Sequence, residues 1–209
     1  MPAYELIIFD FDGTLADSGD WMIRNFNEIA QQFGIRCVTA AEIELLRGRS
    51  NREIIAYMGV PMWKLPRIAT EMRRRVAEAT ETIQLFEGVR EMLISLREAA
   101  IRTAIVSSNS ESNIRRILGT DVASLIDHFE CGASLFGKAS KLKTVVKRSG
   151  VPRARAICIG DETRDIEAAR EAGIDSGAVL WGYANAEILE AFKPSMMFAS
   201  MAQISALAR

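Results

Sequence analysis

Along most of the chain, short runs of consecutive apolar residues alternate with stretches in which apolar residues recur at the spacing of a helix. The runs that predict strands are Glu5–Phe9, Thr103–Val106, Phe129–Gly132, Ala156–Ile159, Ala178–Trp181 and Met196–Phe198. They are apolar at consecutive rather than alternate positions, which indicates strands covered on both faces. Helical spacing between them predicts helices over Val89–Glu98, Glu111–Leu118, Ser140–Ser149 and Asp165–Ala172. The alternation predicts an α/β core of three layers with a mainly parallel sheet.

One interval breaks this alternation. Between the first strand and residue 86, about seventy residues show only helical spacing, as at Met22, Phe26 and Ile29. A crossover between parallel strands needs only about a dozen residues. The excess predicts a helical cap at residues 17–85, inserted into a core made of residues 1–16 and 86–209.

Composition excludes several classes of protein. Hydrophobic residues make up 49% of the chain, and 26 Lys and Arg against 27 Asp and Glu give a formal net charge of −1. This balance argues against a general nucleic-acid binder, and no apolar run reaches the roughly eighteen residues of a membrane span. No signal peptide is visible, and three widely spaced cysteines favour a reducing compartment, so we expect a cytoplasmic protein. The near-zero net charge conceals a basic segment, because the residues from Arg47 to Arg75 include eight basic and only two acidic ones.

Polar residues follow several of the predicted strands. The segment Asp10-Phe11-Asp12-Gly13-Thr14 comes directly after the first apolar run, at the sheet edge where ligands of α/β proteins bind. Further along the chain stand Ser107-Ser108-Asn109, then Lys138 before a helix, and then Gly160-Asp161 with Asp165. Each alone fits a helix cap, a turn or a solvated charge. Together, at the ends of parallel strands, they predict one functional site.

These motifs resemble those of the haloacid dehalogenase-like hydrolase superfamily, in its phosphatase branch, over essentially the whole chain. Residues 10–15 are similar to the first motif, Ser107 to the second, Lys138 to the third, and Gly160-Asp161 with Asp165 to the fourth. The insertion is similar to the small α-helical cap of the phosphoglycolate phosphatase and β-phosphoglucomutase group, and the resemblance implies a Rossmann-like core. Relatives commonly have proline where this chain has Ala139, so Lys141 remains an alternative to Lys138.

The resemblance implies a Mg²⁺-dependent phosphatase that acts on a small phosphorylated metabolite, with phosphoglycolate or a sugar phosphate as the expectation for the family. Asp10 would attack phosphorus and form an aspartyl-phosphate. Asp12 would protonate the leaving oxygen and then activate water. Cations are needed because a carboxylate and a phosphate repel by roughly 4 kcal/mol per pair of unit charges at about 4 Å and an effective dielectric of 20.

The resemblance also assigns residues to the phosphate and to the ion. Binding of the phosphate and ordering of its loop would fall to Thr14, Ser107, Ser108, Asn109 and Lys138. The Mg²⁺ ligands would be Asp10, the backbone carbonyl of Asp12, Asp161 and Asp165, the last bound directly or hydrogen-bonded next to the ion.

The cap would exclude water and confer specificity. Arg47 and Arg49 stand in a turn between two helical patterns, where an arginine could clamp a second anionic group of the substrate. We interpret the run Arg73-Arg74-Arg75 as a solvated helix face, and Trp181 as a packing residue.

Other functions remain open. A relative that binds a phosphorylated ligand without turnover would carry the same groups. Residues 132–138 nearly match the P-loop of an NTPase, although Ala139 stands where Ser or Thr should bind Mg²⁺. Within the family, a phosphomutase or a pyrophosphatase is possible. We expect a monomer or homodimer, without nucleic-acid or membrane partners.

Overall fold

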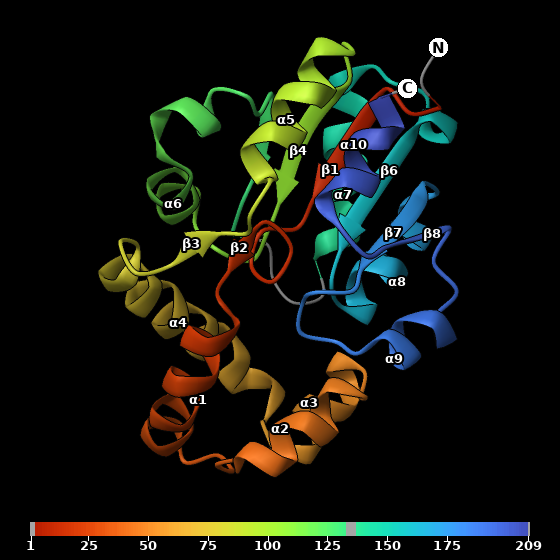
Figure 1. Ribbon diagram of the computed structural model, residues 1–209. Coiled ribbons are helices and arrows are strands. Elements are labelled where there is room, and N and C mark those ends of the chain that lie inside the picture. The colour runs from red at the N-terminus through yellow and green to blue at the C-terminus, as the bar shows by residue number, and fades with distance from the viewer. Residues whose placement is uncertain (1–2, 133–136, 209) are drawn as a thin grey trace.

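A parallel sheet of six strands forms the centre of the molecule in the computed structural model, which describes residues 3–132 and 137–208 (Figure 1). The strands lie in the order β5-β4-β1-β6-β7-β8, and every neighbouring pair is parallel. Their bounds are β1 Leu6–Phe9, β4 Arg102–Val106, β5 His128–Glu130, β6 Ala156–Gly160, β7 Asp175–Val179 and β8 Met196–Phe198. The predicted α/β fold with a parallel sheet is confirmed.

Helices cover both faces of this sheet, because successive side chains of a strand point to opposite faces. On one face, Ile7 and Phe9 of β1 pack with apolar side chains of α5, α6 and α10. On the other face, Leu6 and Ile8 pack with α7 and α8. These helices are α5 Val89–Glu98, α6 Glu111–Ala123, α7 Lys138–Ser149, α8 Thr163–Ala172 and α10 Met201–Ser205, and a shorter helix, α9 Ala186–Ala191, lies between β7 and β8 in the chain.

Two predicted strands are displaced from their observed positions. The strand expected at Ala178–Trp181 is β7, which starts at Asp175, and the strand expected at Phe129–Gly132 is β5, which ends at Glu130. In β7, a Cβ added to Gly177 would lie 2.6 Å from a ring carbon of Phe198 in β8. The ring therefore requires a glycine there, and this small residue interrupts the apolar run that would have revealed the strand.

Three helices are longer than predicted, and one of them, α8, starts at Thr163 rather than at Asp165. Helix α7 starts at Lys138 rather than at Ser140, so Lys138 lies in the first helical turn and not in the loop before it. Helix α6 continues past Leu118 to Ala123, although Gly119 inside it has φ 70° and ψ 166°. A glycine in such a conformation normally ends a helix. Here the chain resumes helical geometry after it.

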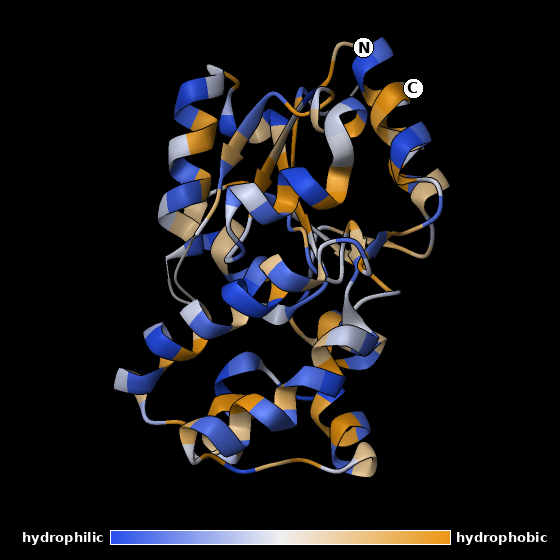
Figure 2. Ribbon diagram, turned by 90° about the vertical axis from the view of Figure 1, so that its left-hand side faces the viewer, coloured by the Kyte–Doolittle hydropathy of each residue, from blue (hydrophilic) through white to orange (hydrophobic). Residues whose placement is uncertain are grey.

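Four further helices form the cap at the carboxyl end of the sheet (Figures 1 and 2). They are α1 Gly19–Phe33, α2 Ala40–Arg47, α3 Asn51–Tyr57 and α4 Leu65–Ala79, with a short 3₁₀ helix at Met62–Lys64 before α4. The sequence sets the start of α2 and of α3 by the same device, a capping box, formed by Thr39 with Glu42 and by Ser50 with Glu53. Figure 2 shows polar and apolar residues alternating along these helices, as amphipathic helices require.

The chain enters and leaves the cap through a two-stranded ribbon that the sequence did not predict. Strand β2, Ala16–Asp17, pairs in antiparallel fashion with β3, Gln84–Leu85. The Phe86 amide extends the ribbon by donating to the Leu15 carbonyl at 2.9 Å. Strands of two residues have no periodicity to detect. Within the two described ranges, no helix has the length and apolar character needed to cross a membrane.

Candidate active site

Asp10 lies immediately after β1, in a tight loop at the edge of the sheet. Its side chain is buried, and Oδ1 accepts a hydrogen bond from the Phe11 amide at 2.8 Å. The loop bends sharply enough for the amides of Leu15 and Ala16 both to donate to the Phe11 carbonyl. Gly13 has φ +75°, and a Cβ there would lie 2.3 Å from Oδ2 of Asp161. The loop therefore requires glycine in order to approach the fourth motif.

Asp12 lines the space between core and cap, where two neighbours fix its carboxyl group. The Asn109 side chain donates to Oδ2 at 3.1 Å, and the Ser18 hydroxyl donates to Oδ1 at 3.1 Å. The Tyr183 hydroxyl lies 2.7 Å from that of Ser18. Burial, and then the charge of Asp10, raises the pKa of Asp12 to about 6. Such a carboxyl group can carry a proton near neutral pH, as a general acid must.

Lys138 supplies a buried positive charge directly beside Asp10. Its Nζ lies 2.9 Å from Oδ2 of Asp10 and 2.5 Å from Oδ1 of Asp165. Burial alone would raise the pKa of Asp10, but the charges of Lys138 and Arg164 hold it below its usual value. Lys141 instead pairs with Glu130 on β5 at 2.9 Å. Of the two candidate lysines, the structure thus brings Lys138 to Asp10.

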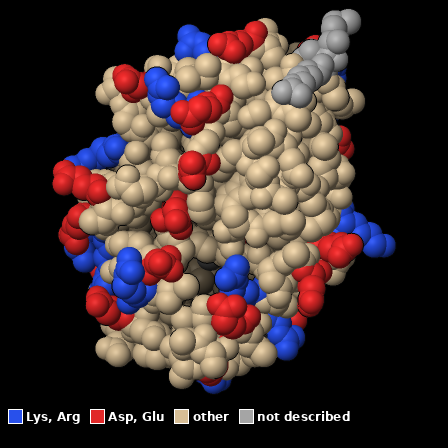
Figure 3. Space-filling view, viewed as in Figure 1, with Lys and Arg blue, Asp and Glu red and all other residues tan. Residues whose placement is uncertain are grey.

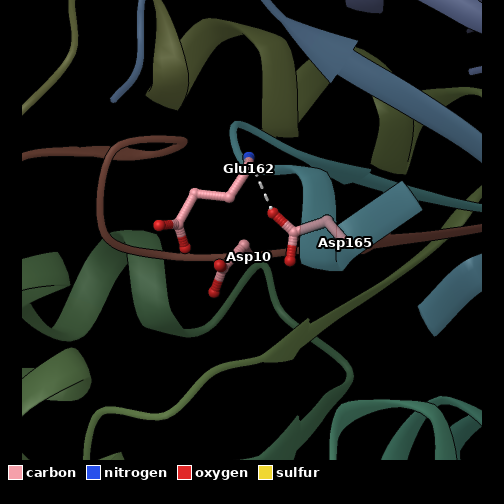
Figure 4. A group of neighbouring side chains, drawn as sticks. All are labelled: Asp10, Glu162 and Asp165. Carbon is pink, nitrogen blue, oxygen red and sulfur yellow. Dashed lines mark hydrogen bonds between the residues drawn. The ribbon is translucent and has the colours of Figure 1, made fainter. Parts of the chain in front are cut away.

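Asp10, Glu162 and Asp165 form a group of carboxylates whose oxygen atoms lie within 4.8 Å of one another (Figure 4). The Glu162 amide donates to Oδ2 of Asp165 at 3.0 Å, and this bond fixes the Asp165 carboxylate at the start of α8. Oδ2 of Asp10 is fully buried, and within the described residues its partners are the cations Lys138 at 2.9 Å and Arg164 at 3.7 Å, with no further hydrogen-bond donor. Carboxylate oxygens are the ligands that Mg²⁺ prefers. The donor set therefore fits the expected ion, and it includes Glu162, which the sequence motif did not indicate.

Asp161 is fully buried next to this group. Oδ1 accepts from the Thr14 hydroxyl at 2.8 Å, and Oδ2 accepts from the Tyr183 amide at 2.9 Å. Burial, followed by the charges of Glu162 and Asp165, raises the pKa of Asp161 well above its usual value. In this structure Asp161 joins Thr14 of the Asp10 loop to the chain at Tyr183.

Arg164 is a second cation at the site, and sequence reasoning missed it. Its guanidinium group lies 2.5 Å from Oε2 of Glu162 and 3.7 Å from Oδ2 of Asp10. The only signal for it was its place between Asp161 and Asp165, at a position that the motif leaves unspecified. Together with Lys138 it offsets the carboxylate charges around Asp10.

The segment after β4 places its polar groups beside Asp12. Ser107 is buried, and its hydroxyl accepts from the Asn109 amide at 3.1 Å. Ser108 and Asn109 line the cavity between core and cap. The Ser108 carbonyl accepts from Arg73 of α4 at 3.2 Å. The structure thus brings Ser107, Ser108 and Asn109 to the same edge as Asp12.

A cavity of about 540 Å³ lies between the cap and this edge of the sheet. Figure 3 shows a hollow on one face of the molecule, with acidic and basic side chains around it. Asp12, Asn109, Arg164 and Tyr183 form part of the cavity wall on the core side. The acid expected to protonate a leaving group therefore faces this cavity.

Arg47 and Arg49 both line this cavity, but each already has partners. Arg47 donates to the carbonyls of Tyr183 and Gly182 at 3.1 and 3.2 Å. Arg49 lies 3.4 Å from Glu53 in an exposed ion pair. Arg47 consequently joins the cap to the core, and Arg49 is the more accessible of the two to solvent.

The interpretation of Arg73–Arg75 as a solvated face was wrong for two of the three residues. Arg73 bonds to the Ser108 carbonyl across the cavity, and Arg75 is largely buried between Glu71 and Glu28. Only Arg74 lies on an exposed surface. Packing of α4 on its neighbours, which the sequence alone does not give, decides these orientations.

Trp181 packs as predicted, with its ring edge-on to Phe86 at 6.2 Å between centroids. Its indole also donates to the Thr14 carbonyl at 3.1 Å, which links the segment after β7 to the Asp10 loop. Most of the P-loop-like segment, residues 133–136, lies outside the described residues.

Comparison with known proteins identifies the family of this chain. Residues 7–179 match the family described as haloacid dehalogenase-like hydrolase. The chain is 34% identical to a phosphoglycolate phosphatase of Synechococcus elongatus, covering 92% of each chain, and 31% identical to one of Xanthomonas campestris pv. campestris, covering 85% of this chain and 83% of that protein. A haloacid dehalogenase-like family hydrolase of Streptococcus pneumoniae has the same fold, with a TM-score of 0.78, 21% identity and 99% coverage of both chains. The chain therefore belongs to the haloacid dehalogenase-like hydrolase family, within its phosphatase branch.

Proposed function

We propose that the protein is a Mg²⁺-dependent phosphatase that hydrolyses a small phosphorylated metabolite through a phosphorylated Asp10. The observation that carries this proposal is the contrast between two carboxyl groups two residues apart. The pKa of Asp10 is lowered, so that it stays an anionic nucleophile, while the pKa of Asp12 is raised to about 6. Environments that separate the pKa values of paired carboxyl groups mark an acid and a nucleophile.

In the first step, an Asp10 carboxylate oxygen attacks phosphorus and the bond from phosphorus to the leaving oxygen breaks. Asp12 gives its proton to that oxygen, and its side chain is held for this by Asn109 and Ser18. In the second step, water gives a proton to Asp12 and its oxygen attacks phosphorus. The bond from phosphorus to Asp10 then breaks, phosphate leaves, and both side chains return to their starting states.

The remaining groups would hold the phosphate and offset its charge. Lys138 lies within 2.9 Å of Asp10 and would bind the transferring group as a fixed cation. Asp10, Glu162 and Asp165, together with the Asp12 carbonyl and Asp161 that the family motif indicates, are the candidates to hold Mg²⁺. When bound, the ion supplies positive charge to the phosphoryl oxygens.

The relatives' names make phosphoglycolate the first substrate to test. For a substrate with a second anionic group, Arg49 is the candidate to bind it, and it would exchange its exposed partner Glu53 for that group. If so, Arg49→Ala lowers kcat/KM for phosphoglycolate more than for an aryl phosphate. Equal losses on both substrates would remove Arg49 from this role. The cysteines, Cys37, Cys131 and Cys158, are all free, which favours the cytoplasm as its location.

The decisive experiment is phosphate release by purified wild-type protein and by Asp10→Asn, in the presence of Mg²⁺. We expect loss of at least about 10³-fold in kcat, because the variant lacks the nucleophile. Acid quenching of the wild type during turnover should yield a phosphorylated peptide that contains Asp10. Asp121→Asn, on the exposed surface of α6, is the matched control and should keep wild-type activity.

Other outcomes would support different functions. Ligand binding without phosphate release would indicate a non-catalytic relative, and selective turnover of ATP would favour an NTPase. Selective hydrolysis of pyrophosphate would indicate a pyrophosphatase. Transfer of phosphate between positions of a sugar, without net release, would indicate a phosphomutase.

A further inference from the structure

Much of the cavity wall on the cap side is apolar. Helix α4 contributes a stripe at helical spacing, Leu65, Ile68, Ala69, Met72 and Val76, and all five residues line the cavity. From the other helices, Met22, Phe26, Ile43, Leu46, Ile54 and Met58 line it as well. The cap side of the cavity is thus largely apolar, although Asp20, Arg49 and Asn51 also line it.

Part of this apolar surface is not used to hold the cap together. Val38, Leu46 and Met58 form a packed cluster with side chains such as Phe26 and Ile54. Met22, Leu65, Ile68 and Met72 are only half-buried and belong to none of the packed apolar clusters in the described residues. Their free faces line the cavity, where an apolar ligand would remove them from water.

The charged residues of the wall do not offer a ready site for a second anion. Arg47 and Arg73 donate to backbone carbonyls of the core, and Arg164 pairs with Glu162. Arg49 pairs with Glu53. A carboxylate on the leaving group would therefore have to displace an existing partner, whereas an uncharged apolar leaving group would not.

The size of the cavity points in the same direction. Its 540 Å³ lies within the range of about 300–1,000 Å³ that is typical of sites for drug-sized ligands. The glycolate part of phosphoglycolate would occupy only a small fraction of this space.

We propose that the substrate is a phosphate monoester of an alcohol with an apolar or aromatic body, and that this body lies against Met22, Leu65, Ile68 and Met72. This inference rests on the proposed phosphatase function, and it identifies the substrate class. Hydrolysis breaks the bond between phosphorus and the alcohol oxygen, the alcohol receives the Asp12 proton, and water supplies the oxygen that phosphorus gains.

The test is phosphate release by the wild type from a series of n-alkyl phosphates, from ethyl to octyl, with phosphoglycolate alongside. We expect kcat/KM to rise about fourfold per added methylene until the cavity is filled, as burial of CH₂ groups at about 0.8 kcal/mol each predicts. The longer esters should exceed phosphoglycolate. This series needs no variant, so it does not depend on whether a mutated cap folds.

A matched pair of variants on α4 then locates the binding surface. Ala69→Phe adds a ring inside the cavity wall, and Arg67→Phe adds the same ring on the exposed side of the helix. Ala69→Phe should abolish the preference of octyl over ethyl phosphate while ethyl phosphate is still hydrolysed. Arg67→Phe should keep the full preference.

The possible failures differ from one another. If kcat/KM is independent of chain length, or phosphoglycolate exceeds every alkyl ester, the apolar substrate class is wrong while the phosphatase function stands. If Ala69→Phe and Arg67→Phe keep the same chain-length dependence, the assigned surface is wrong. If no ester releases phosphate, the proposed function itself fails and the inference fails with it.

Discussion

Asp10 and Asp12 carry the same side chain, and their different behaviour comes entirely from their neighbours. Lys138 and Arg164 face Asp10, whereas Asp12 is held by the uncharged groups of Asn109 and Ser18. The different roles proposed for Asp10 and Asp12 therefore follow from the side chains that surround each of them. Two predictions belong to this scale.

The first prediction concerns Asp12. In Asp12→Asn, steady-state hydrolysis of p-nitrophenyl phosphate should fall by about 10²–10⁴-fold, the usual contribution of a general acid–base group. The nitrophenolate group of this substrate needs little protonation to leave, so Asp10 should still become phosphorylated. Hydrolysis of the phosphorylated Asp10, which requires Asp12 to activate water, should become slow. Rapid-mixing experiments should then show a burst of nitrophenol close to one equivalent of enzyme. A loss of rate without a burst would contradict the assignment of Asp12 to the second step.

The second prediction compares two glycines of positive φ. Gly34, at φ +58°, has nothing within 4 Å of an added Cβ, whereas a Cβ on Gly13 would lie 2.3 Å from Oδ2 of Asp161. Gly34→Ala should cost about 1–2 kcal/mol of stability, the strain of a left-handed residue alone. Gly13→Ala should cost more and should also lower phosphatase activity, because Asp161 must move. Thermal unfolding and phosphate release check both variants, and equal effects would show that the contact with Asp161 is unimportant.

Among the helices, α2 and α3 start at local hydrogen bonds rather than on a deep core. Helix α3 has no fully buried residue and α2 has one, Leu46. At the start of α2, the Thr39 amide donates to Glu42 at 2.8 Å, and the Tyr57 hydroxyl donates to the same carboxylate at 2.6 Å. These bonds, the one from Tyr57 first, lower the pKa of Glu42 from 4.5 to about 2.

The pH dependence of cap stability follows from this shift. Because the pKa of Glu42 is lower in the folded protein, its contribution is fully present above about pH 4.5 and is lost as pH falls toward 2. Glu42→Gln should lower the melting temperature at pH 7, and the difference from wild type should shrink to less than half by pH 3. Glu44→Gln is the control, on the same helix but without the capping contacts. A difference that is constant with pH would exclude ionised Glu42 as the cause.

Strands made of continuous apolar runs could be predicted from the sequence. Bounds that depend on a side chain of a neighbouring element could not. Residues 6–9 and 156–159 pair in the central sheet as their composition suggested. The start of β7 was missed because Gly177 makes room for Phe198, a requirement set by another strand. The same distinction holds at the site. Asp10 and Asp12 stand in a recognisable motif, whereas the role of Glu162 depends on how α8 begins beside Asp10.

In the molecule as a whole, several side chains of the cap bond directly to the core around the cavity, and Ser18 does so through Asp12. Arg47 and Arg73 donate to core carbonyls, and Asn51 donates to Glu162 at 2.8 Å and accepts from Thr163 at 3.2 Å. Asn51 thus connects the start of α3 to the carboxylate group that is the candidate metal site. The cap is therefore hydrogen-bonded to the core next to the cavity and the candidate metal site.

Asn51→Ala should therefore weaken closure of the cap. Loss of hydrogen bonds worth about 1 kcal/mol each should raise KM at least about fivefold, with faster hydrogen exchange in α3. Arg52→Ala, exposed on the next position of the same helix, should change neither quantity. An unchanged KM in Asn51→Ala would mean that Arg47 and Arg73 suffice to hold the cap.

The β2–β3 ribbon has a consequence for how such proteins can diversify. Ala16 and Leu85 are directly paired neighbours, so the two ends of the insertion stand only one strand spacing apart. The segment between them could be exchanged for a hairpin turn, or for a different lid, without altering the path of the chain on either side. On the proposed roles, such an exchange would replace the apolar wall of the cavity and leave the Asp10 loop unchanged.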